Sequence, residues 1–312
     1  MGGVSVVVTT YRRAWVLPNL FSALSRQTLL PSEVVVVLKP SGDGSERVIE
    51  EWGRELPIRL VVQGCGNVAE AVEMGLKSSS CSYVLFVDDD AVPREDWAEK
   101  YVKLFEQYSD AGGVGGITYK AYLRGGGVEL VNEEFYPEEA TASWPHRRPL
   151  PEFEGYCGWI SVSGLPGARV CGDPVVPSTN IGGVNMGFRK EAVADCPIGS
   201  LYEGSRKCLH YEEFLCYCAR IKGFRTYLVK DPSIAPIVYH LAGVESLTRG
   251  RGFTHEFWLH YDRVMDYWRL RKLGAKVSLA SYLLAMAVLL RSKTIPRALA
   301  FLYANASNIK RK

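Results

Sequence analysis

The stretch Ser82–Trp97, SYVLFVDDDAVPREDW, places three consecutive aspartates directly after a run of apolar residues. Tyr83–Val87 is apolar or aromatic at all five positions, which predicts a buried strand. Asp88, Asp89 and Asp90 then follow at its carboxyl end, where like charges repel and desolvation of a carboxylate costs free energy. The pattern therefore predicts either a cation at this place or an opening to water.

Three earlier runs of β-branched and aliphatic residues predict further strands at Val4–Tyr11, Ser32–Pro40 and Ile58–Gly64. Apolar residues at helical spacing follow each strand, so strands and helices alternate over about 110 residues. This alternation predicts an α/β fold with a mostly parallel central sheet and helices on its faces. Ligands of such sheets bind beyond the carboxyl ends of the strands, which is where the three aspartates lie.

The middle of the chain is less regular. Between Gly112 and Pro177 the periodicity fades, and we expect irregular strands and loops with room for a second ligand. Order returns with a strand and a helix from Lys190, a helix near Glu212–Lys222 and a strand that ends at His240.

The C-terminal part begins with an aromatic-rich helix at Phe253–Gly274. The uncharged stretch Val277–Leu290 follows, and it is shorter than the roughly 20 residues that a membrane-spanning helix needs. It is either a core helix or a helix in a membrane interface, with Arg291 and Lys293 at its end. The sequence leaves both possibilities open.

Bulk composition excludes several classes of protein. The 312 residues are 47% hydrophobic and 23% charged, which is typical of a globular chain. The net charge is +3, and the sequence predicts no concentrated basic face, so nucleic acid is not an expected partner. The eight cysteines include no CxxC pair, so no structural zinc site is expected. We see no secretory signal and expect a cytoplasmic location, or the cytoplasmic face of the membrane if the C-terminal helices bind lipid.

Four segments occur in an order that resembles the nucleotide-diphospho-sugar glycosyltransferases of family 2, which have the GT-A fold. They are VVVTTYRRAWVLPNLFSALSRQTLLPSEVVVV, YVLFVDDDAVPREDW, NIGGVNMGFRKEAV and YEEFLCYCARIKGFRTYLVKDPSIAPIVYH. The resemblance implies a catalytic domain at residues 1–250, with a nucleotide-sugar-binding half at 1–110 and an acceptor-side half at 111–250. Residues 251–312 would add C-terminal helices. It also implies inverting transfer from a nucleoside-diphosphate sugar to a hydroxyl of a glycan or a lipid-linked acceptor.

The resemblance implies roles for the acidic residues. Asp88 and Asp90, with His240 as a third ligand, would hold Mn²⁺ or Mg²⁺, and this cation would balance the aspartates. The general base would be one of two acidic residues that open a helix, Glu212 or Glu213. We prefer Glu212, because it aligns with the family's aspartate in a gapless count and its helix face should contact the sheet. Taken alone, these acidic residues would merely suit the N-terminal ends of helices.

Donor contacts are expected from strand ends and from one glycine-rich loop. These residues are Thr9, Tyr11, Arg12, Lys39, Asp43, Asp88, Asp89, Arg249 and Arg251. The chain departs from the family after the second strand, where Leu38 and Lys39 stand in place of the usual acidic pair. Recognition of the base is therefore left open. This departure supports an alternative function, a GT-A-like module that binds a nucleotide without turnover.

Overall fold

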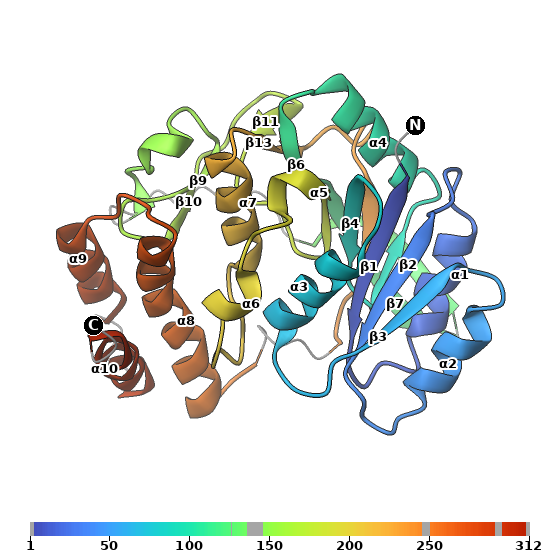
Figure 1. The fold of residues 1–312 in the computed structure, drawn as a ribbon, viewed down its shortest axis with the longest axis horizontal. Helices are drawn as coiled ribbons and strands as arrows, with labels where there is room; N and C mark the ends of the chain where they lie inside the picture. The colour runs from blue at the N-terminus through green and yellow to red at the C-terminus, as the bar shows by residue number, and fades with distance from the viewer. Residues whose placement is uncertain (1–2, 126, 136–145, 245–249, 291–294, 310–312) are drawn as a thin grey trace.

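The computed structural model describes residues 3–125, 127–135, 146–244, 250–290 and 295–309. In these ranges the largest sheet has eight strands, and it lies at the centre of the molecule (Figure 1). In spatial order the strands are Val175–Pro177 (β11), Arg225–Val229 (β13), Ala111–Gly115 (β6), Asn185–Arg189 (β12), Tyr83–Val87 (β4), Val4–Thr10 (β1), Glu33–Leu38 (β2) and Ile58–Val62 (β3). β4, β1, β2 and β3 are parallel, while β12 is antiparallel to both of its neighbours. The predicted α/β fold with a mostly parallel sheet is therefore confirmed.

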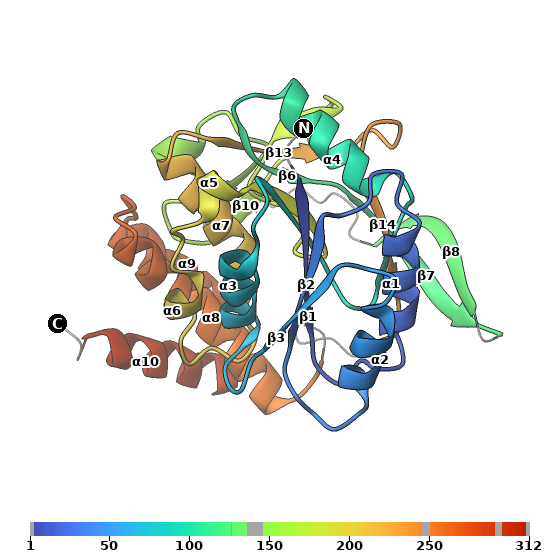
Figure 2. The ribbon, with the colours of Figure 1, turned by 45° about the vertical axis from the view of Figure 1, so that its right-hand side comes forward.

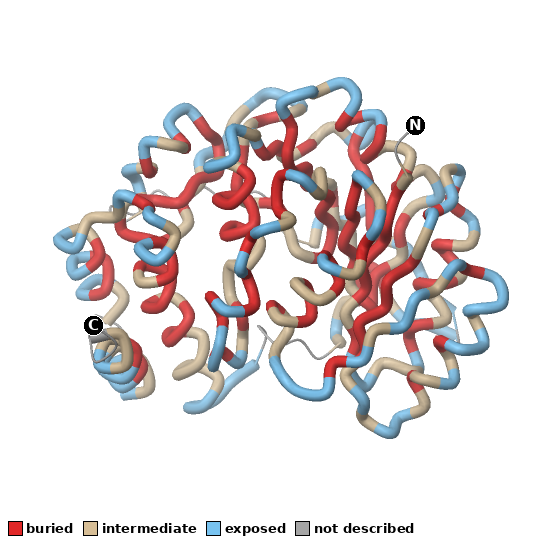
Figure 3. Tube along the Cα trace, in the orientation of Figure 1, coloured by how far each residue is buried: buried red, intermediate tan, exposed pale blue. Residues whose placement is uncertain are grey.

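Helices cover both faces of this sheet, which explains why its central strands are continuously apolar. One face carries Leu17–Ser25 (α1), Ser45–Trp52 (α2) and Trp97–Gln107 (α4). The other carries Val68–Ser78 (α3), Lys190–Val193 (α5), Ile198–Leu201 (α6) and Tyr211–Ile221 (α7). Along β1, Val6 and Val8 pack on the first face and Val7 on the second. Figure 3 shows the central strands as the most continuously buried part of the trace.

Helix α3 approaches β1 closely, and a glycine makes this possible. A Cβ atom built on Gly75 would lie 2.3 Å from Cγ1 of Val7, a distance that real Cβ contacts essentially never show. At the opposite end of the helix, Asn67 and Glu70 form a reciprocal capping box. These two features fix α3 against the sheet and place its N-terminus near the strand ends.

The strand register brings the predicted site residues to one edge. Thr10 pairs with Leu38 across β1 and β2, and the Lys39 amide donates to the Thr10 carbonyl oxygen at 3.0 Å. Val7 pairs with Phe86, so the aspartates after β4 lie beside the end of β1. The carboxyl ends of three strands therefore meet, as the parallel arrangement predicts.

A second sheet places His240 at this edge. It contains Ala91–Pro93 (β5), Ile237–Leu241 (β14), Ile117–Arg124 (β7) and Gly127–Glu134 (β8). β14 runs antiparallel to β5, and His240 pairs with Ala91. The hairpin of β7 and β8 projects from the body of the molecule (Figure 2). This hairpin corrects the expectation of irregular structure after Gly112, although short elements do follow it, namely Gly158–Ile160 (β9) and Pro166–Ala168 (β10).

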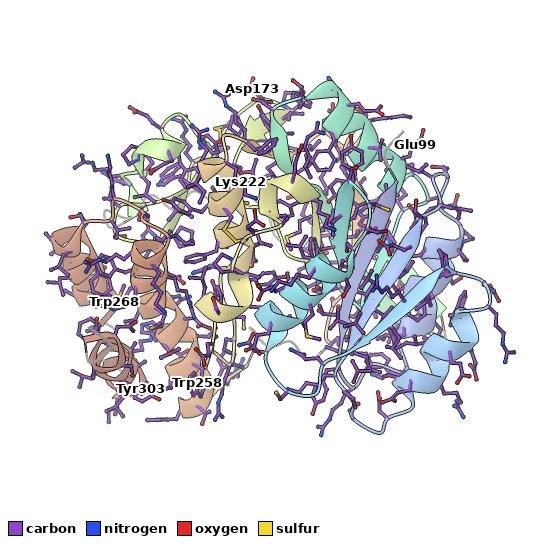
Figure 4. The ribbon with its side chains drawn as sticks, in the orientation of Figure 1. Glu99, Asp173, Lys222, Trp258, Trp268 and Tyr303 are labelled. Atoms are coloured by element: carbon purple, nitrogen blue, oxygen red, sulfur yellow. A yellow bond between two sulfur atoms is a disulfide. The ribbon has the colours of Figure 1, made fainter. Side chains whose placement is uncertain are left out.

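Three C-terminal helices pack on the α6 and α7 side of the molecule (Figure 1): Phe253–Lys272 (α8), Leu279–Leu290 (α9) and Ile295–Ile309 (α10). Trp258, Trp268 and Tyr303 lie on this side of the molecule (Figure 4), and the Trp268 indole donates to Asn305 of α10 at 3.0 Å. Tyr282 of α9 is buried among these helices. Among the described residues, no helix is both long and apolar enough to span a membrane.

Two disulfides join cysteines that the sequence could not pair. Cys157 bonds to Cys171, and Cys196 bonds to Cys218 of α7. The other four cysteines are reduced, and two of them, Cys208 and Cys216, are buried.

Candidate active site

One cavity of about 1570 Å³ opens at the carboxyl ends of β1, β2 and β4. Most of the residues expected to act together line it: Thr9, Tyr11, Arg12, Lys39, Asp88, Asp89, Asp90, Glu212, Glu213 and His240. Asp43 and Arg251 are not among the lining residues, and Arg249 lies outside the described residues. Residues from both halves of the expected catalytic domain thus share one cavity.

Asp88, Asp90 and His240 form a group that could hold a metal ion. One ligand atom from each lies within 4.8 Å of the others. Nε2 of His240 is 2.9 Å from Oδ1 of Asp90, and both side chains are buried. The Leu241 amide donates to the Asp90 carbonyl oxygen at 3.0 Å, so β14 and the aspartate loop are held together by their backbones. Two carboxylates and an imidazole are ligands that suit Mn²⁺, and the carboxylates also suit Mg²⁺.

The middle aspartate has a different environment. Nε of Arg13 lies 3.6 Å from Oδ1 of Asp89, and Nη2 of Arg13 lies 3.7 Å from Oδ2 of Asp90. Burial raises the pKa of Asp89 to about 8, the charge of Asp90 adds to the rise, and Arg13 opposes it. Arg13 therefore supplies a resident positive charge beside the triplet. Sequence reasoning missed it, although its place just after β1 was a usable signal.

Glu212 and Glu213 lie at the start of α7, and different neighbouring charges shift the pKa of each. The pKa of Glu212 is raised to about 8, and burial is the largest cause. The charge of Glu213 is the next cause that raises it, and the charge of Asp88 also contributes. Burial also raises the pKa of Glu213, where His210 opposes the rise and Asp266 of α8 adds to it. Of the two glutamates, Glu212 is thus the one whose pKa is raised by the charge of Asp88, after β4. A buried carboxyl group with a raised pKa suits a general base near neutral pH.

Cations surround an aromatic ring at the end of β1. Tyr11 is 46% exposed, and its ring centroid lies 5.1 Å from the Arg12 guanidinium carbon and 5.7 Å from Nζ of Lys39. Nζ of Lys39 also donates to the Gly66 carbonyl oxygen at 2.8 Å. Arg12 has a φ of 58°, an uncommon left-handed conformation for a residue other than glycine. An exposed ring between cations can stack on a planar group and attract its negative charge.

Asp43 has a local role in the structure. Its carboxylate accepts hydrogen bonds from the Ala14 amide at 3.0 Å and from the hydroxyls of Ser41 and Ser45 at 2.9 and 2.8 Å. Partial burial alone would raise its pKa, but these hydrogen bonds dominate and lower the pKa of Asp43 to about 2. The carboxylate therefore ties the loop after β2 to the loop after β1.

Sequence reasoning also missed the contribution of α8. Arg263 of α8 lines the cavity, and Oδ2 of Asp266 lies 2.7 Å from Nδ1 of His210, the residue that precedes α7. The fully buried Arg269 pairs with Asp266 at 2.9 Å and with Asp262 at 2.7 Å. The contact between His210 and Asp266 joins residues 56 positions apart, which sequence spacing does not reveal.

The chain matches known proteins mainly in its N-terminal half. Residues 5–147 match the family model described as glycosyl transferase family 2. Glucosyl-dolichyl phosphate glucuronosyltransferase of Haloferax volcanii is 30% identical over 142 residues, which cover 44% of this chain and 42% of that protein. Chondroitin synthase of Escherichia coli is 32% identical over 105 residues, 33% of this chain and 15% of that protein. The matched region is thus less than half the length of these relatives.

Solved structures agree in fold over almost the whole chain. TarS 1-349 of S. aureus in complex with UDP-GlcNAc superposes with a TM-score of 0.59 at 16% identity, covering 99% of this chain and 81% of that one. The mannosyltransferase PcManGT of Pyrobaculum calidifontis, in complex with GDP-Man and Mn²⁺, gives a TM-score of 0.51 at 15% identity, with 99% and 81% covered. Residues 5–147 are therefore similar to glycosyl transferase family 2, and the chain has the GT-A fold.

Proposed function

We propose that this chain is an inverting, metal-dependent glycosyltransferase that moves a sugar from a nucleoside-diphosphate donor to a hydroxyl of an acceptor. The observation that carries the proposal is one cavity that contains both the Asp88, Asp90 and His240 group and the half-buried carboxyl of Glu212. The family match and the names of the relatives support the same class of reaction.

In the proposed mechanism, the diphosphate of the donor lies beside Asp88 and Asp90. A divalent cation held there with His240 would neutralise charge on the leaving diphosphate. Glu212 accepts the proton of the acceptor hydroxyl, and the oxygen forms a bond to the anomeric carbon. The bond from that carbon to the diphosphate breaks, and its electron pair leaves with the phosphate oxygen. Attack from the face opposite the leaving group inverts the anomeric centre.

Tyr11, Arg12 and Lys39 would bind the nucleotide. The ring of Tyr11 offers a stacking surface and the two cations offer charge, in place of the family's acidic pair after the second strand. The neighbours with donors in their crystal structures hold UDP-GlcNAc in one case and GDP-Man in the other, so both nucleotides belong in a donor panel.

A lipid-linked acceptor is consistent with the C-terminal helices. Leu283 and Leu284 of α9 and Leu302 and Tyr303 of α10 are each about half exposed or more. One relative acts, by its name, on a glucosyl-dolichyl phosphate. We propose that this apolar surface contacts the membrane interface. Flotation with anionic liposomes tests this: the Leu283→Ser/Leu302→Ser variant should float less than the wild-type chain, and equal flotation would refute it.

The cytoplasmic location expected from the sequence stays a prediction. Disulfides are more typical of oxidising compartments, although intracellular proteins of hyperthermophiles also contain them. Thiol counting on the chain purified under non-reducing conditions would show whether the two bonds of Cys157 and Cys196 form in the host.

A donor panel with Mn²⁺ or Mg²⁺, with released nucleotide as the readout, tests the proposed function. Asp90→Ala should abolish metal-dependent turnover. Glu212→Ala should keep donor binding but lose transfer. Wild-type rates in both variants would reject the site. Nucleotide binding without turnover of any donor would favour the alternative of a binding module, which the residues Leu38 and Lys39 support.

A further inference from the structure

Cationic side chains gather on the α8 side of the cavity. Lys207 and His210 come from the loop that precedes α7, and Arg263 comes from α8. His146 also lines this part, and its pKa is lowered first by burial and then by the charges of Arg263 and His210. Lys207, His210 and Arg263, the α8-side cations, thus line one cavity, and the charge of Arg263 acts on both His146 and His210.

Nearby carboxylates are engaged with other partners. Asp262 and Asp266 both pair with Arg269, and Glu256 pairs with Arg297 at 3.0 Å. Within the described part of the chain, neither Arg263 nor Lys207 forms a hydrogen bond or an ion pair through its charged group. Asp266 and Glu256 favour the charged form of Arg263, and Asp262 that of Lys207, but without a direct contact they offset only part of the cost of burial.

Arg263 has a pKa lowered first by burial and then by the neighbouring charge of Arg297. Lys207 likewise has a pKa lowered by burial. Both shifts have the sign expected for cations that lack a compensating charge. An anion bound between Arg263 and Lys207 would raise the pKa of both side chains.

His210 is held with one nitrogen toward α8. Its Nδ1 lies 2.7 Å from Oδ2 of Asp266, and its φ of 65° is a left-handed conformation. Burial alone would lower the pKa of His210, but Asp266 dominates and raises it, which favours the imidazolium. The bond at Nδ1 leaves Nε2 as the nitrogen that a ligand in the cavity can contact.

The position of these cations relative to the donor side follows from Glu212. The charge of Asp88 raises the pKa of Glu212, whereas the charge of His210 lowers it, so the proposed base senses both groups. The aspartates lie at the end of β4, and His210 lies next to α8. Glu212 therefore lies within electrostatic reach of both Asp88 and His210, and we take the α8 side of the cavity as the side on which the acceptor binds.

We propose that Lys207, His210 and Arg263 bind a phosphate group of the acceptor, as a subsite distinct from the donor's diphosphate. The inference rests on the proposed function, because it takes Glu212 as the base that separates donor from acceptor. A guanidinium, an ammonium and an imidazolium from two elements can contact several oxygens of one phosphate. The phosphate can belong to a soluble sugar phosphate or to a lipid-linked sugar.

Direct binding tests the subsite without turnover. Glucose 1-phosphate is titrated into the full chain in EDTA, so that no metal recruits it to the aspartates, and binding is followed by calorimetry. We expect saturable binding that weakens at least tenfold in Arg263→Gln and in Lys207→Gln. Methyl glucoside, which lacks the phosphate, should not bind. The exposed Arg271→Gln on the same helix is the matched control and should bind like the wild-type chain.

Absent binding, or equal binding by wild-type, Arg263→Gln and Lys207→Gln chains, would overturn the proposal. Loss of binding in Lys39→Gln alone would also overturn it, because the phosphate would then occupy the donor side. Two substituted positions guard against a folding defect in one of them, and thermal melts confirm that each variant is folded. The dodecyl phosphodiester of glucose, titrated in parallel, identifies the source: tighter binding than the free ester assigns a lipid-linked acceptor, and weaker binding a soluble one.

Failure of this inference is distinguishable from failure of the proposed function. Slow donor hydrolysis by water, with Mn²⁺ present, needs no acceptor, so measured on the wild-type chain it tests the donor side independently of glucose 1-phosphate binding. A chain that binds glucose 1-phosphate through Arg263 but turns over no donor would refute the transferase and keep the anion subsite. A chain that transfers sugar but binds glucose 1-phosphate no better than methyl glucoside would refute the anion subsite and keep the transferase.

Discussion

Transfer by this chain should accelerate as the pH rises from 6 to 9. The proposed base, Glu212, must lose its proton before it can accept one from the acceptor. Burial, reinforced by Glu213 and Asp88, raises its pKa to about 8. Since the group is an acid, the active ionised form is scarce below this pKa and predominant above it.

The size of the effect follows from the ionised fraction. With a pKa of about 8, roughly 1% of Glu212 is ionised at pH 6, half at pH 8 and roughly 90% at pH 9. The value of kcat/KM should therefore rise about fifty-fold from pH 6 to pH 8 and level off near pH 9. A cation beside Asp88 offsets that carboxylate's charge, so saturating metal should move the midpoint to a lower pH.

The assay measures kcat/KM for transfer between pH 6 and pH 9 at two metal concentrations. Glu212→Gln should lower the rate by roughly 10²- to 10⁴-fold and remove the rise with pH. Glu203→Gln, at an exposed position in the loop after α6, is the matched control and should keep the wild-type profile. A flat or falling wild-type profile would refute the reasoning, and loss of transfer in Glu213→Gln alone would move the role to that residue.

Three further predictions concern metal binding and stability. Asp90→Asn should weaken Mn²⁺ binding in calorimetric titrations while Asp173→Asn, at an exposed site, leaves it unchanged; equal affinities would contradict the metal site. Arg269→Met leaves the buried Asp262 without its counter-ion and Asp266 with His210 alone, and should lower the free energy of unfolding by roughly 3–5 kcal/mol in denaturant titrations. Gly75→Ala should cost roughly 1–3 kcal/mol through overpacking against Val7, and Val7→Ala in the same chain should recover part of that loss.

The sequence predicted the central sheet because its strands are buried on both faces. Their apolar runs need no alternation, and each ends in polar residues at the carboxyl edge. The position of Asp88 and Asp90 follows directly from this, since they come after β4 without an intervening turn. His240 came from the family resemblance, and the antiparallel pairing of β14 with β5 brings it to Asp90.

Other parts of the site depend on tertiary packing that no local pattern encodes. Asp43 looked like a donor contact, yet two serines and the Ala14 amide engage its carboxylate. The pairing of His210 with Asp266 joins a loop to α8, which the sequence predicts only as an aromatic-rich helix. Such contacts are set by how α8 packs on the body of the molecule, so sequence spacing carries no signal for them.

Charge is distributed across the cavity in a way that favours ordered binding of two anions. On the donor side Arg13 balances only part of the charge of Asp88, Asp89 and Asp90, so a diphosphate should bind there more tightly when a metal ion is also present. The opposite side carries cations that need no metal, Lys207 and Arg263 among them. Two anionic groups would repel each other in an unscreened cavity, but each would meet its own positive charge here, and the carboxyl of Glu212 is within electrostatic reach of both Asp88 and His210. The same arrangement that separates the charges also places the proposed base where donor and acceptor meet.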